Sequence, residues 1–106
     1  MLNNSLGSSI RNQLKPSTLT SVTADGAAIN GPCRLITVVI SASASGSVVL
    51  YDNTAASGTN LFGTLAISGA GTTTVSIPNG GTVVANGVYV DVTGSITSVT
   101  LGTRAL

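Results

Sequence analysis

Short runs of β-branched and apolar residues, separated by clusters of Gly, Asn, Pro and Ser, are the feature that most constrains how this chain folds. Val, Ile, Thr and Tyr suit a pleated, packed strand, whereas Gly, Asn, Asp and Pro favour turns. The spacing, with no convincing helix in the body of the chain, predicts about eight short strands in an antiparallel sandwich or barrel. The predicted strands are Thr18–Ala24, Cys33–Ala42, Ser47–Asp52, Leu61–Ile67, Thr72–Ile77, Thr82–Val84, Val88–Thr93 and Ile96–Leu101.

The segments between these strands carry turn signals. The predicted turns and loops are Asp25–Gly26, Ile29–Pro32, Ser43–Gly46, Ser68–Gly71, Pro78–Gly81, Asn86–Gly87 and Gly94–Ser95. Ser43–Gly46 is predicted to be a short hairpin link, and Gly94–Ser95 a turn between the last two strands. The fold class that follows is all-β.

Alternation within two strands predicts which side chains face the core. In Cys33–Ala42 the two faces are Ile36, Val38 and Ile40 on one side and Leu35, Thr37 and Val39 on the other. Both faces are partly apolar, so this strand is predicted to be central or covered on both sides. In Val88–Thr93 the inward set is Val88, Val90 and Val92, and the outward set is Tyr89, Asp91 and Thr93.

The composition favours one folded domain that lives in an assembly. The chain has 106 residues, of which 42% are hydrophobic and 7% are charged, and its formal net charge is +1. Disorder requires low hydrophobicity and high net charge, so it is excluded for the body of the chain. A net charge this small gives little repulsion between copies, which favours a subunit of an assembly over a free monomer.

Location is constrained by what the sequence lacks. No apolar run is long enough to span a bilayer, and the N-terminal residues lack the basic and apolar regions of a secretory signal. Cys33 is the single cysteine, which excludes an intramolecular disulfide. We therefore expect no membrane association and synthesis in a reducing cytoplasm.

Residues 1–17 form a zone of their own, predicted to be an N-terminal arm preceding the β-domain at residues 18–106. Its apolar residues recur every four positions, at Leu2, Leu6, Ile10 and Leu14. Gly7 weakens a helix here and Pro16 ends it, so an extended arm and a frayed tail remain alternatives. Both charges of the arm, Arg11 and Lys15, are positive. If the arm binds a partner, the predicted contact residues are Leu6, Ile10, Arg11, Leu14 and Lys15.

Catalytic chemistry has few residues to use. The chain has no His and no Glu, so the commonest general base and the commonest metal ligand are missing. Cys33 has no histidine partner and opens the most apolar strand, which predicts a core residue rather than a nucleophile. Asp25, Asp52 and Asp91 are scattered, and Asp52 with Asn53 is the least unfavourable calcium candidate. We expect no enzyme activity, no cofactor and no metal site.

Binding of nucleic acid or of a small molecule is also disfavoured. Nucleic-acid affinity needs a basic patch, whereas the four basic residues are spread along the chain. Only three residues are aromatic: Tyr51, Phe62 and Tyr89. Tyr89 points away from the valine stripe, so it is a candidate interface residue, the alternative being an ordinary exposed cross-strand residue.

Three stretches carry a resemblance to a known family: SGSVVLYDNTAASGT at Ser45–Thr59, VANGVYVDVTG at Val84–Gly94 and SVTLG at Ser98–Gly102. They resemble a group of small tailed-phage virion proteins that decorate or cement the head shell. The resemblance implies a jelly-roll-like antiparallel β-sandwich. It also implies a non-enzymatic capsid protein, located on the virion surface, that binds the major shell protein as a homotrimer.

The second hypothesis is a tail or head fibre domain that recognises a host carbohydrate. A fibre would need a long trimeric stalk, whereas only the short arm precedes the β-domain. A cell-surface adhesive domain is a third alternative, which the missing secretion signal disfavours.

Overall fold

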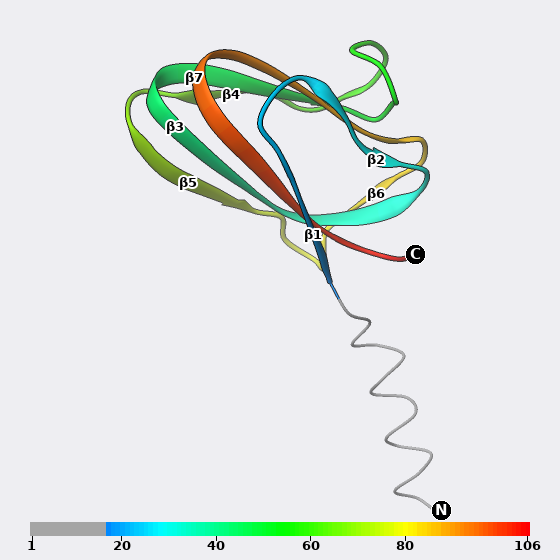
Figure 1. The fold of residues 1–106 in the computed structure, drawn as a ribbon. Helices are drawn as coiled ribbons and strands as arrows, with labels where there is room; N and C mark the ends of the chain where they lie inside the picture. Colours follow the sequence, from blue (N-terminus) through cyan, green and yellow to red (C-terminus); the bar gives the residue numbers. More distant parts are fainter. Residues whose placement is uncertain (1–16) are drawn as a thin grey trace, which may run out of the picture.

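The computed structural model describes residues 17–106, and residues 1–16 lie outside this description. The described part is all-β, with one antiparallel sheet and no helix, hence no helix able to cross a membrane (Figure 1). The seven strands are β1 (Thr18–Val22), β2 (Gly26–Asn30), β3 (Cys33–Tyr51), β4 (Asn60–Ile67), β5 (Gly71–Ser76), β6 (Thr82–Val84) and β7 (Gly87–Arg104).

Two long strands, β3 and β7, form the centre of the sheet. They pair antiparallel along almost their whole length, from Arg34 opposite Arg104 to Tyr51 opposite Tyr89. The first half of β3 also pairs with β5 and β6, and its second half with β4. On the far side of β7, β2 pairs with its first half and β1 with its last part. Figure 1 shows β3 and β7 curving together, which curves the whole sheet.

Two predicted turns are wrong, because Ser43–Gly46 and Gly94–Ser95 are bends inside β3 and β7. Gly46 and Gly94 are direct partners at this bend, and Gly94 has a φ of 81°. A Cβ on Gly94 would lie 2.8 Å from the Cα of Gly46, so the two backbones cross too closely for a side chain. The prediction of about eight short strands is therefore corrected to seven, of which two are long.

The predicted loop at Ile29–Pro32 is also wrong in part, because Gly26–Asn30 forms β2 on the edge of β7. The loop prediction rests on its turn residues, and the short strand before them has no regular alternation because its register shifts between Ala27 and Ile29.

The core is one cluster that joins both halves of the curved sheet. Its buried hydrophobic residues are Cys33, Leu35, Val38, Ile40, Ala42, Val48, Leu50, Ile67, Val84, Val88, Val90, Val99 and Leu101. Val88 and Val90 face inward as predicted, and Val92 packs against the cluster. The two predicted faces of Cys33–Ala42 need a correction: Leu35 is buried together with Val38, because the register with β7 shifts between Leu35 and Thr37.

Candidate functional site

The outward-facing side of the β2–β7–β3–β4 half of the sheet carries both tyrosines. Tyr89 on β7 lies directly opposite Tyr51 on β3, and both are half-buried. Ala27 on β2 is the neighbour of Tyr89 on its other side, and Asn60 on β4 is the neighbour of Tyr51. A cross-strand aromatic pair stabilises a sheet and offers a rigid contact surface. We call Ala27, Val49, Tyr51, Tyr89 and Asp91 the tyrosine face.

Asp91 is the carboxylate of this face. Its backbone pairs with Val49 on β3, whereas its side-chain carboxylate has no hydrogen bond or ion pair with any residue in 17–106. The tyrosine face therefore offers two aromatic rings and one unengaged negative charge, a combination suited to binding rather than to proton transfer.

The other two carboxylates, those of Asp25 and Asp52, accept hydrogen bonds from backbone N–H groups of other segments. Asp25 follows β1, and its Oδ1 accepts a hydrogen bond from the Val92 N–H at 2.8 Å, next to the bend of β7. Asp52 ends β3, and its carboxylate accepts hydrogen bonds from the N–H groups of Asn86 at 2.8 Å and Ala85 at 3.2 Å. Buried or loop backbone donors need such partners. Asp25 and Asp52 are thus explained by structure alone.

The calcium candidate at Asp52 and Asn53 has its oxygens directed to different partners. Asn53 Oδ1 accepts the Thr54 N–H at 2.8 Å, and Asn53 Nδ2 donates to the Ser57 carbonyl at 3.0 Å. These bonds close the turn after β3 on itself. Among residues 17–106, no group of three or more His, Cys, Asp or Glu side chains is arranged to hold a metal ion.

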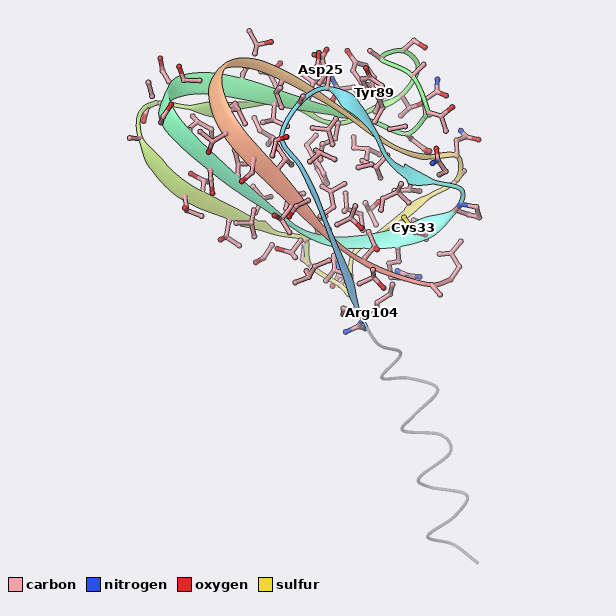
Figure 2. The ribbon with its side chains drawn as sticks, in the orientation of Figure 1. Asp25, Cys33, Tyr89 and Arg104 are labelled. Atoms are coloured by element: carbon pink, nitrogen blue, oxygen red, sulfur yellow. The ribbon has the colours of Figure 1, made fainter. Side chains whose placement is uncertain are left out.

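Cys33 is a core residue, as predicted. Its side chain belongs to the buried hydrophobic cluster (Figure 2), and its strand neighbour on β6 is Val84. Burial raises the pKa of the Cys33 thiol, and the Asp52 carboxylate raises this pKa further. A raised pKa lowers the thiolate fraction at neutral pH, which makes this thiol a poor nucleophile.

Folded protein is therefore expected to react with a charged aromatic disulfide reagent at pH 8 at least about ten times more slowly than protein unfolded in urea.

The raised pKa of the Cys33 thiol also makes the free energy of unfolding depend on pH. The contribution of this thiol to stability is fully present below its pKa in the unfolded protein and is lost as the pH rises through its pKa in the folded protein. Alkaline conditions should thus lower the free energy of unfolding, and Cys33→Ala should weaken this pH dependence. Equal reaction rates in folded and unfolded protein would contradict the assignment of Cys33 to the core.

Two arginines that are far apart in the sequence meet at the other end of the sheet. Arg34 on β3 lies opposite Arg104 on β7, and neither has an ion-pair partner among the described residues. The Arg104 Nε atom is buried and has no hydrogen-bond partner. Figure 2 shows Arg104 at one end of the molecule, and Asp25 and Tyr89 at the other. Sequence spacing could not reveal this pair, because it depends on the β3–β7 register.

The predicted contact residues Leu6, Ile10, Arg11, Leu14 and Lys15 lie outside the described residues. Of the predicted site residues, only Tyr89 is placed, and the residues that join it are Tyr51 and Asp91. A shallow hollow at the β4–β5 turn, lined by Ala66–Thr73, has no charged or aromatic side chain. It therefore lacks the groups that would orient a small molecule. Comparisons with protein-family models, curated proteins and solved structures found no match.

Proposed function

We propose that this chain is a non-enzymatic structural protein of a tailed-phage particle, which decorates or cements the head shell as an oligomer. The observation that carries the proposal is the position of the three stretches that resemble such proteins. Gly46–Tyr51 on β3 pairs with Tyr89–Gly94 on β7, and Ser98–Gly102 pairs with the first half of β3. Parts of all three stretches therefore lie on the two central strands, whereas residues 52–59 of the first stretch form the loop after β3.

The chemistry of the described residues supports this proposal. Two of the three aspartates bind backbone N–H groups, and the thiol lies in the core. What remains on the surface is a tyrosine face, a pair of arginines and many uncharged hydroxyl side chains. Of these groups, tyrosine and arginine are enriched in contacts between proteins.

The proposal includes a finer description of the fold. The curved sheet has a β1–β7–β3–β5 half and a β2–β7–β3–β4 half, and side chains from both halves share one core. We propose that the two halves act as the two layers of a jelly-roll-like sandwich. We also propose a homotrimer, with residues 1–17 reaching the major shell protein through Leu6, Ile10, Arg11, Leu14 and Lys15.

Purified particles produced from the genome that encodes this chain test the proposal. Quantitative mass spectrometry should find the chain in a fixed ratio to the major shell protein, and gold-labelled antibodies should mark the head. Particles that lack the chain, or label confined to the tail, would contradict a head decoration protein.

A second candidate function is carbohydrate binding by a fibre domain, and the tyrosine face favours it. The two adjacent half-exposed aromatic rings can stack on a sugar, and the Asp91 carboxylate beside them can accept hydrogen bonds from its hydroxyl groups. A screen of purified protein against bacterial surface glycans tests this candidate. The thermal midpoint of Thr100→Ala serves as the reference for a folded surface variant. If glycan binding disappears in Tyr51→Ala and Tyr89→Ala while their thermal midpoints stay close to this reference, the fibre domain is favoured over decoration.

A further inference from the structure

Two consecutive strands, β4 and β5, form one edge of the sheet. Within residues 17–106 each of them pairs only with β3, β4 with its second half and β5 with its first half. Their other edges have no strand partner among the described residues. A free edge presents a row of backbone N–H and C=O groups that can pair with another chain.

The register of β5 with β3 shows which backbone groups of β5 lie on its free edge. The Ile77 N–H donates to the Ile36 carbonyl at 3.0 Å, and the residues of an antiparallel strand alternate between facing and not facing their partner. The backbone N–H and C=O groups of residues 73 and 75 therefore bond to β3. The backbone groups that point to the free edge belong to Thr72, Thr74 and Ser76. The Thr37 hydroxyl, which donates to the Val75 carbonyl, agrees with this assignment.

The same alternation applies to β4. The Val92 N–H lies opposite Val48 but donates to the Asp25 carboxylate and not to β3, so the backbone groups of Val48 face β4. Val48 is the partner of Leu65. The backbone of Leu65 therefore bonds to β3, and the free groups of β4 belong to Thr64 and Ala66.

The regularly paired part of β4, Thr64–Ile67, and the whole of β5 carry no charge that would repel another strand. Residues 53–90, which include β4, β5 and β6, contain no charged residue. Natural proteins that stay monomeric usually protect a free edge with lysine, proline or an inward-pointing charge. Here β4 and β5 contain neither a charged residue nor a proline.

Apolar side chains beside this edge are only partly covered. Leu61, Leu65, Val75 and Ile77 pack against the core but are not fully buried. A strand added to the edge would cover part of this apolar surface while it satisfies the free backbone groups.

We infer that β5 of one copy pairs with β4 of a second copy, so that the sheet continues from one subunit into the next. The bend of β3 separates the two edges, which then face different neighbours. A two-fold β5–β5 contact ends at a dimer, whereas a contact between unlike edges can close into a ring. The choice of β4 as the partner edge rests on the homotrimer in the proposed function.

Two proline variants test the contact with purified full-length protein and no particles. Thr74→Pro removes a free N–H from β5, and Ala66→Pro removes one from β4, while the bonds to β3 remain. Light scattering at low micromolar concentration should give a trimer for the parent and a monomer for each variant. An equimolar mixture should form a 1:1 heterodimer, because each variant retains one intact edge.

Lysine variants keep the test valid if a proline variant does not fold. Thr74→Lys places a charge at the edge and should also give monomers. Ser98→Lys, on the same face of the central strand β7, should remain a trimer, because the Ser98 side chain has no hydrogen bond among residues 17–106. A monomeric parent, or a trimer that survives Thr74→Lys, would overturn the inference. A dimeric parent that is lost in Thr74→Pro but kept in Ala66→Pro would replace it with β5–β5 pairing. Absence from particles would bear on the proposed function alone.

Discussion

Gly94→Ala is expected to lower the free energy of unfolding by about 2–4 kcal/mol, because the new side chain is both strained and crowded. Gly94 has a φ of 81°, a conformation that L side chains rarely adopt. The new Cβ would lie 2.8 Å from both the Gly46 Cα and the Ser45 carbonyl oxygen, so the backbone of β3 would have to move. Against a total stability of about 5–15 kcal/mol, this loss is large.

Gly69→Ala is the matched control for this prediction. Gly69 lies in the β4–β5 turn, has no left-handed φ, and a Cβ there would meet no atom within 4 Å. Its unfolding free energy should change by less than about 0.5 kcal/mol. Urea unfolding of both variants measures the difference, and equal midpoints would show that the bend at Gly46 and Gly94 does not need glycine.

The bend also shows where sequence reasoning fails in this fold. Glycine, serine and alanine at Ser43–Gly46 favour a turn locally, yet the chain bends and continues into the second half of β3 without reversing its direction. Local propensity cannot distinguish a hairpin from a bend in a long strand, because the outcome depends on whether β7 supplies a glycine opposite Gly46. The all-β class depends only on local alternation, so the sequence sufficed to predict it.

The candidate site was predictable only in part for the same reason. Alternation placed Tyr89 outward, but its neighbour Tyr51 follows from the long-range register of β3 with β7. The pairing of Arg34 with Arg104 has the same origin. The structural roles of Asp25 and Asp52 depend on which backbone N–H groups lie nearby, a property that no short motif encodes.

Deletion of residues 1–17 is expected to leave the sheet folded and to remove the protein from particles. The deletion stops before Thr18, the first residue of β1 that pairs with β7, so no ladder of the described sheet is lost. Far-UV circular dichroism and the thermal midpoint should match those of the full chain. Occupancy of particles, measured by mass spectrometry against the shell protein, should fall at least about tenfold, which corresponds to a loss of about 1.4 kcal/mol per site.

The expected loss of occupancy follows from two opposing free energies, that of burying apolar side chains of the arm and that of ordering its backbone. Burying an apolar side chain such as Leu6, Ile10 or Leu14 contributes about 1.5–3 kcal/mol, an upper figure, whereas ordering the backbone costs about 1–2 kcal/mol per residue. The net binding of one arm is therefore weak, and stable attachment requires several arms on one oligomer. Full-length variants separate the two contributions: Ile10→Asn with Leu14→Asn removes the apolar contacts at constant charge, and Arg11→Glu with Lys15→Glu reverses the charge. Ser8→Ala with Ser9→Ala is the control and should retain parental occupancy. Undiminished occupancy of the truncated protein would mean that the shell is bound by the sheet and not by the arm.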